Sequence, residues 1–100
     1  MRLPISFDEE KIKDFCRRWK ICEFSLFGSV LREDFNPESD VDILISFDPE
    51  IPWSLFDWID MIEELKEIFG REVDLVEKSG LRNPFRRREI LTNRQVVYAT

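Results

Sequence analysis

The segment that most constrains the fold is Val41–Phe47, where β-branched or aromatic side chains recur at every second position. This period of two predicts a β-strand whose apolar face packs under helices. The opposite face carries Asp40, Asp42 and Ser46 and should be at least partly open. A chain with such a strand needs a sheet that helices cover on one side and that leaves polar groups on the other.

The segments around this strand alternate between helical and extended patterns. Ser6 and Glu9 match a capping box for a helix that runs to about Trp19. The next predicted elements are a strand over Ile21–Phe27, a helical turn from Ser29, and a helix that Ser54 caps and that runs to about Phe69, where Gly70 stops it. They are followed by a strand over Glu72–Val76, a helix from Asn83-Pro84 to about Leu91 and a short strand over Gln95–Tyr98. This order predicts a layered α/β or α+β domain.

Composition narrows the class of protein. A chain of 100 residues fits one domain spanning residues 1–100, and 43% apolar residues suffice for a core. No apolar run approaches the ~18 residues of a membrane span, and the start lacks the apolar region of a signal peptide. We therefore expect a cytoplasmic protein without a membrane partner, in which Cys16 and Cys22 are reduced thiols that fill the core.

The absence of histidine excludes several catalytic chemistries. Without imidazole there is no serine–histidine or cysteine–histidine nucleophile pair and no histidine general base. Any chemistry must use carboxylates, hydroxyls, lysine, arginine or a bound metal ion.

Carboxylates supply the strongest chemical signal. Asp40 and Asp42 are two residues apart along a predicted strand, so they share one face with Cα atoms about 6.5–7 Å apart. Such a pair repels unless a cation or proton lies between the carboxylates, and magnesium prefers oxygen ligands. Asp74 occupies the open face of the next predicted strand. If the two strands are neighbours, three carboxylates can hold two metal ions for phosphoryl transfer.

Gly28 and Ser29 lie at a predicted strand-to-helix turn. Glycine allows a phosphate to approach the backbone closely, and the amides at a helix start favour an anion. The Ser29 hydroxyl adds a donor, and Arg32, one turn later, can reach a phosphate or a carboxylate. Each of these features is common alone, but Gly28-Ser29 followed after ten residues by Asp40-Val41-Asp42 is a specific spacing.

With this spacing, the sequence resembles the DNA polymerase beta-like nucleotidyltransferase superfamily. It is most similar to the minimal nucleotidyltransferases (MNT), the small partners in HEPN–MNT toxin–antitoxin pairs. The segment from Phe27 to Ile45 matches their signature almost throughout, and the resemblance extends from the first helix to Tyr98. It implies the nucleotidyltransferase fold, a small mixed β-sheet with helices packed mainly on one face.

The resemblance also implies roles for individual residues. Gly28 and Ser29 match the residues that hold the nucleotide triphosphate, and Arg32 matches an arginine with a less defined role. Asp40 and Asp42 match the metal-binding pair. Asp74 matches the third carboxylate, which completes the metal site and can help to deprotonate the attacking hydroxyl. Glu33 departs from the pattern, because many relatives carry glycine there, but that position is not a metal ligand.

The activity implied is transfer of AMP from ATP, with two magnesium ions, to a hydroxyl. The acceptor would be a tyrosine of a HEPN-type toxin ribonuclease, which the modification silences. Two alternatives remain open at this point. The chain could transfer AMP to a small-molecule alcohol, or it could neutralise its partner by binding alone, with a vestigial metal site.

Two further features have both a structural and a functional interpretation. The formal charge of −6 argues against a nucleic-acid-coating protein, but residues 78–100 carry six basic residues and one acidic residue. One or two of Arg86, Arg87 and Arg88, or Lys78, could meet ATP phosphates or an acidic partner, or these residues could simply be solvated. The role of the basic segment as a whole, which includes Arg82, is left open by the sequence. The predicted helix ending at Phe69 has a wide apolar surface, which predicts core packing and, near Trp53 and Phe56, a possible partner surface.

Overall fold

The computed structural model describes residues 7–31, 39–47 and 53–100. Its helices are α1 (Glu9–Trp19), α2 (Leu55–Phe69) and α3 (Pro84–Thr92), and its strands are β1 (Ile21–Phe27), β2 (Val41–Phe47), β3 (Val73–Glu77) and β4 (Gln95–Ala99). Two short 3₁₀ helices, η1 (Gly28–Leu31) and η2 (Lys78–Gly80), follow β1 and β3. The predicted order of elements is confirmed, and η2 is an addition that the sequence patterns did not indicate.

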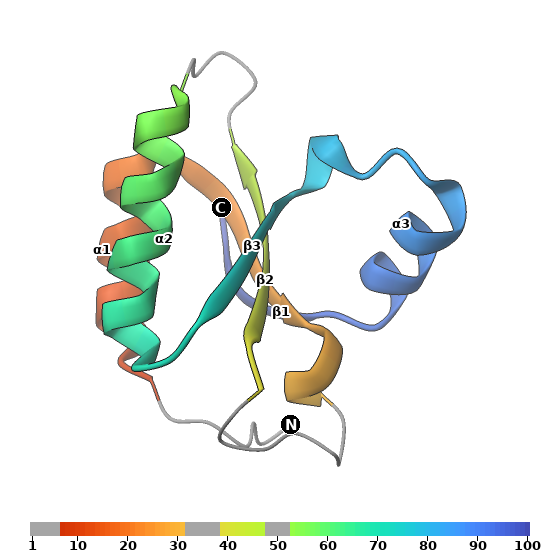
Figure 1. Ribbon diagram of the computed structural model, residues 1–100, viewed down its shortest axis with the longest axis horizontal. Helices are drawn as coiled ribbons and strands as arrows, with labels where there is room; N and C mark the ends of the chain where they lie inside the picture. Colours follow the sequence, from red (N-terminus) through yellow and green to blue (C-terminus); the bar gives the residue numbers. More distant parts are fainter. Residues whose placement is uncertain (1–6, 32–38, 48–52) are drawn as a thin grey trace.

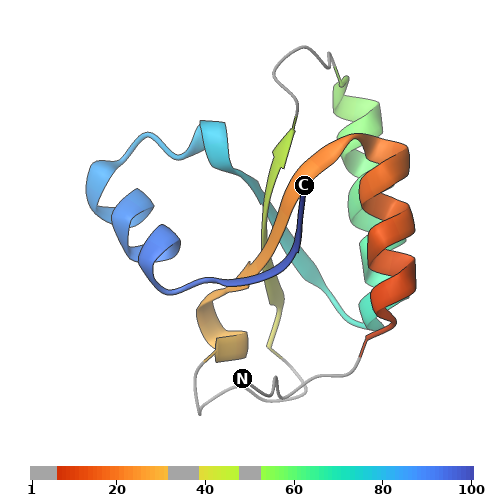
Figure 2. The ribbon, with the colours of Figure 1, turned by 180° about the vertical axis from the view of Figure 1, so that it is seen from behind.

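Within the described ranges, the strands form one mixed sheet in the order β3-β2-β1-β4. β1 pairs antiparallel with β2 and with β4, whereas β2 and β3 are parallel neighbours. Helices α1 and α2 lie side by side on one face of the sheet, and α3 lies on the opposite face (Figures 1 and 2). The predicted mixed sheet with helices mainly on one face is therefore confirmed.

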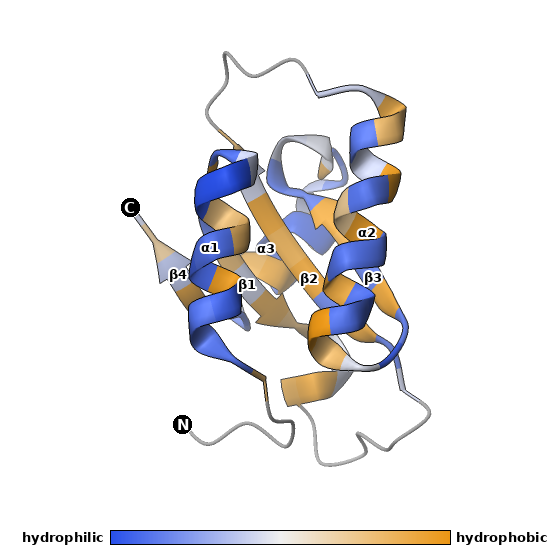
Figure 3. Cartoon of the chain, turned by 90° about the vertical axis from the view of Figure 1, so that its left-hand side faces the viewer, coloured by the Kyte–Doolittle hydropathy of each residue, from blue (hydrophilic) through white to orange (hydrophobic). Residues whose placement is uncertain are grey.

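The main core lies between the sheet and the helix pair. Alternate residues of β2 point into it, and Val41, Ile43 and Ile45 are fully buried. The outward side of α1 is largely hydrophilic, whereas the strands behind the two helices are hydrophobic (Figure 3). A smaller cluster on the other face of the sheet joins Phe27 and Leu44 to Leu81 and Ile90, and it anchors α3.

The helix boundaries have clear local causes. Asp8 caps α1 by accepting a hydrogen bond from the backbone amide of Glu10. The prediction that Ser6 is the N-cap is therefore wrong. Ser6 itself lies outside the described residues. Ser54 caps α2 and Gly70 ends that helix in the left-handed region, both as predicted. Asp57 completes a capping box with Ser54, which the sequence patterns did not indicate. Asn83 caps α3 ahead of Pro84.

The start of α2 carries apolar side chains that do not enter the core. Leu55 and Phe56 are 72% and 78% exposed, and Ile59 is also exposed. The interpretation of this surface as a partner contact stays a prediction. None of the helices in the described part of the chain is long and apolar enough to cross a membrane.

The two cysteines are free thiols. Cys16 is fully buried among the core residues, and this burial raises its pKa to about 12. Cys22 is half-buried, and its thiol donates to the carbonyl of Ser46 at 3.2 Å. The prediction that Cys16 fills the core is confirmed.

Candidate active site

Two aspartates lie opposite each other on neighbouring strands. Asp42 of β2 and Asp74 of β3 are register partners in the parallel pair. Residues in direct register point to the same side of a sheet. The residues that flank these aspartates along their strands, Val41, Ile43 and Leu75, are buried on the side of α1 and α2. Because side chains alternate along a strand, Asp42 and Asp74 point to the other side, where α3 lies. The sequence left open whether these strands are neighbours, and the sheet order answers that question.

Asp40 immediately precedes β2 and is exposed. The hydroxyl of Ser29 donates to the backbone carbonyl of Asp40 at 3.3 Å. This bond ties η1 to the start of β2, so Ser29 has a structural contact beside the phosphate-binding role predicted for it. Arg32 lies outside the described residues.

Gly28 is required at its position for two separate reasons. Its φ of +71° lies in the left-handed region, which disfavours residues with a side chain. A Cβ atom at this position would lie 2.2 Å from Oδ2 of Asp42, so only glycine lets the carboxylate lie against the backbone. The turn after β1 is thus packed directly on one of the predicted metal ligands.

The three aspartates do not form a closed cluster. Across the described residues, no three acidic or thiol side chains stand close enough to share one metal ion. The structure aligns the strands that carry Asp42 and Asp74 without gathering three carboxylates at one point. The roles of Asp40, Asp42 and Asp74 in metal binding and catalysis stay predictions.

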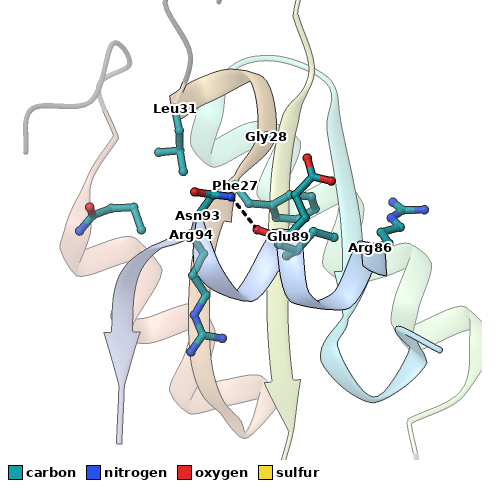
Figure 4. Close-up of a pocket in the computed structure, with 9 residues that line it drawn as sticks. Phe27, Gly28, Leu31, Arg86, Glu89, Asn93 and Arg94 are labelled. Carbon is teal, nitrogen blue, oxygen red and sulfur yellow. Dashed lines mark hydrogen bonds between the residues drawn. The ribbon is translucent and has the colours of Figure 1, made fainter. Parts of the chain in front are cut away.

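A cavity of about 600 Å³ opens next to Gly28. Its lining comes from the end of β1, the turn after it, and α3 with the residues that follow it. It consists of Phe27, Gly28, Leu31, Arg86, Glu89, Ile90, Asn93, Arg94 and Gln95 (Figure 4). No sequence pattern predicted a cavity here. Two of its lining residues, Gly28 and Arg86, were nevertheless among those predicted to meet a phosphate.

The three consecutive arginines of α3 have different surroundings. Arg86 lines the cavity, whereas Arg87 donates to the backbone carbonyl of Lys78 at 3.0 Å and so fixes α3 to η2. Arg88 is exposed, as is Arg82. Of the described arginines and lysines proposed from sequence to meet a phosphate, Arg86 is the one that lines this cavity with Gly28.

Comparison with known proteins gives the family. Residues 9–97 match the nucleotidyltransferase domain family. The chain belongs to this family. It is 40% identical over 86 residues to the protein adenylyltransferase MntA of Thermococcus cleftensis, an alignment that covers 86% of this chain and 82% of that protein.

Solved structures show the same nucleotidyltransferase fold. A toxin–antitoxin structure with AMP-PNP superposes with a TM-score of 0.73 at 21% identity, covering 93% of this chain and 74% of the other. A complex of a tri-AMPylated HEPN toxin of Shewanella oneidensis with an MNT antitoxin gives a TM-score of 0.65 at 20% identity, covering 92% of this chain and 70% of the other. The fold implied by the resemblance of the sequence is confirmed.

Proposed function

We propose that this nucleotidyltransferase transfers AMP from ATP to a tyrosine hydroxyl of a HEPN-type toxin and thereby acts as its antitoxin. The observation that carries the proposal is the register of Asp42 with Asp74 beside Gly28, within a nucleotidyltransferase domain. The relative from Thermococcus cleftensis is named a protein adenylyltransferase, and a structural neighbour pairs an MNT antitoxin with an AMPylated HEPN toxin. Both names support a protein as the acceptor.

The reaction forms one bond and breaks another at the α-phosphorus of ATP. The acceptor oxygen attacks this phosphorus, the bond to the bridging oxygen of the β-phosphate breaks, and pyrophosphate leaves. Asp74 is exposed and can take the proton from the acceptor hydroxyl. The backbone amide of Gly28 can donate a hydrogen bond to the phosphate chain at the turn after β1. The hydroxyl of Ser29 has a single hydrogen, so it can donate to the phosphate in place of the carbonyl of Asp40.

The donor set of this face suits a hard cation. Asp40, Asp42 and Asp74 offer only carboxylate oxygens, and magnesium prefers oxygen ligands. These residues would hold the magnesium ions, which supply positive charge that offsets the charge developing on the attacking and leaving oxygens. Because Oδ2 of Asp42 lies against Gly28, the same carboxylate borders both the proposed metal site and the phosphate-binding turn.

The test is to combine the chain with the product of its neighbouring gene, ATP and magnesium, and to weigh that product by mass spectrometry. We expect it to gain one or more AMP units. The double variant Asp40→Asn/Asp42→Asn is nearly isosteric and should still fold and bind the partner. Transfer should fall by about two orders of magnitude or more, since the charge that holds the metal ions is lost.

Co-expression separates catalysis from neutralisation by binding. If the double variant fails to protect cells from the toxin, the antitoxin activity depends on AMP transfer. Full protection without added AMP would show that binding alone neutralises the partner, and the enzymatic account of its role would be wrong.

A further inference from the structure

The most exposed large apolar side chain of the described residues lies on α3. Phe85 is 85% exposed, although phenylalanine is among the residue types most often found in a core. Arg82 and Arg88, three residues before and after it, are also exposed. Because residues three apart are neighbours on a helix surface, Phe85 and Arg88 point to the same side of α3. Arg82, Phe85 and Arg88 are named the α3 patch below.

The arginines of the α3 patch are available to the carboxylates of another molecule. Arg18 and Arg94 are paired with acidic residues of this chain, but in the part of the chain that the structure describes Arg82 and Arg88 form no ion pair. Residues 78–100 carry a charge of +5, from six basic residues and one acidic residue, in a chain whose net charge is −6. A local positive charge of this kind, in an acidic chain, attracts an acidic partner to one place on the surface.

The α3 patch lies beside the proposed active site. Helix α3 is on the face of the sheet to which Asp42 and Asp74 point, whereas α1 and α2 are on the other face (Figures 1 and 2). One turn along α3 from Phe85, Glu89 lines the cavity next to Gly28. A protein that brings a hydroxyl to this face therefore comes within reach of the α3 patch.

We propose that the α3 patch docks an acidic surface of the acceptor protein, with an apolar side chain of that protein covering Phe85. The inference rests on the proposed function, because it takes the acceptor to be a protein. Carboxylates of the acceptor pair with Arg82 and Arg88, and the ring of Phe85 loses its water at the centre of the contact, as aromatic hot spots do. Nucleic acid suits this face less, because the net charge of −6 and the aspartates of the same face repel a phosphate backbone.

Two exposed phenylalanines on opposite faces of the sheet give a matched test. Phe56 of α2 is 78% exposed, so Phe85→Ser and Phe56→Ser each remove a ring that lies outside the core. We would measure the Kd of each variant for the purified product of the neighbouring gene, without ATP, by isothermal titration calorimetry. Phe85→Ser should weaken binding by about tenfold or more, as the loss of an aromatic anchor does, and Phe56→Ser should bind as the wild type does.

Charge reversal tests whether the docked surface is acidic. Arg82→Glu/Arg88→Glu should weaken binding by about tenfold or more and remove most of its dependence on sodium chloride between about 50 and 300 mM, since salt screens the charges that are reversed. Lys11→Glu/Arg17→Glu changes the net charge by the same amount at exposed positions of α1 and should have little effect. The affinity for ATP with magnesium should stay unchanged in all variants, because none of these residues lines the cavity beside Gly28.

Three results would overturn the inference. The first is equal affinity of the wild type, Phe85→Ser and the double variant of the α3 patch for the protein partner. The second is weakening by Phe56→Ser alone, which would place the partner on α2. The third uses single-stranded RNA of about 20 nucleotides as the competing occupant. RNA binding that is lost in the α3 variants, with unchanged binding of the protein partner, would assign the patch to nucleic acid.

The outcomes are separable from those of the transfer experiment. Binding that depends on the α3 patch, without transfer of AMP, contradicts the proposed activity and leaves the docking surface standing. AMP transfer by Phe85→Ser with the same KM for the acceptor protein as the wild type contradicts the docking surface alone.

Discussion

Gly28 has both a positive φ and a close contact with the carboxylate of Asp42. The other two glycines of the chain allow the effects of these two features to be measured separately. Gly70 also has a positive φ, but a Cβ there would meet nothing within 4 Å. A Cβ at Gly80 would likewise meet nothing within 4 Å. The three glycines therefore form a matched set for mutagenesis.

We predict that Gly28→Ala reduces AMP transfer by about 100-fold, because the added Cβ displaces the carboxylate of Asp42. Gly70→Ala should lower the free energy of unfolding by about 1–2 kcal/mol through backbone strain and keep its activity. Gly80→Ala should change little. Transfer rates and urea denaturation of the three variants provide the measurements. Equal activity of Gly28→Ala and Gly70→Ala would contradict a special role for the contact with Asp42.

Cys16 predicts a pH dependence of stability. Burial raises its pKa in the folded state from 9.0 to about 12, so the folded protein keeps this proton where the unfolded chain loses it. The stability due to Cys16 is fully present below pH 9 and is lost as the pH rises from about 9 to about 12. Urea denaturation at pH 8 and pH 10.5 should show a smaller decrease for Cys16→Val than for the wild type. An identical decrease in both proteins would argue against this assignment.

At the scale of elements, one acidic residue joins the two helices that cover the main core. Glu64 of α2 accepts hydrogen bonds from the guanidinium of Arg18 and, at 2.9 Å, from the indole of Trp19, both in α1. Arg18 is also paired with Asp14 of its own helix at 2.8 Å. The contact fixes the relative position of the helices on the face of the sheet opposite the proposed site.

We predict that Glu64→Ala lowers the free energy of unfolding by about 1 kcal/mol, since it removes a partner of the half-buried indole of Trp19. Glu67→Ala, at an exposed position of the same helix, should be nearly neutral. Both variants should retain full transfer activity, because Glu64 contacts α1 and not the site. Thermal denaturation and the transfer assay measure the two effects. A loss of activity in Glu64→Ala with unchanged stability would contradict this interpretation.

Local patterns predicted most element boundaries. Ile21–Phe27 and Val41–Phe47 are strands with the predicted bounds, and Gly70 ends α2 as expected. These signals act between residues close in sequence, through alternation and left-handed caps. The start of α1 differs because Asp8, like the predicted Ser6, is a residue type that caps helices, and the pattern alone did not choose between them.

The site was only partly predictable, because its contacts join residues distant in sequence. The spacing of Gly28, Asp40 and Asp42 indicated the chemistry, but the packing of Gly28 on Asp42 depends on the pairing of β1 with β2. The charge asymmetry of the C-terminal segment did not distinguish Arg86 from Arg87. That distinction depends on how α3 packs on the sheet through Ile90.

At the scale of the whole molecule, ligand binding should raise the stability of the fold. ATP with magnesium at about a hundredfold excess over its Kd adds about 2.7 kcal/mol, or roughly 11–22 °C in Tm for a domain of this size. The shift should be smaller for Ser29→Ala, since that variant loses a phosphate donor. Scanning calorimetry with and without ATP tests this prediction. No shift at millimolar ATP would count against a working nucleotide site.

The register of β2 with β3 also has a consequence for how the chain folds. If β3 slipped by one residue, Asp74 would turn toward the core side, among side chains such as Met61 and Leu65, which are fully buried. Burying an unpaired carboxylate there costs several kcal/mol, so the slipped pairing is strongly disfavoured. The acidic residue proposed to activate the acceptor therefore also selects the correct strand alignment during folding, and substituting Asp74 with an apolar residue would remove both functions at once.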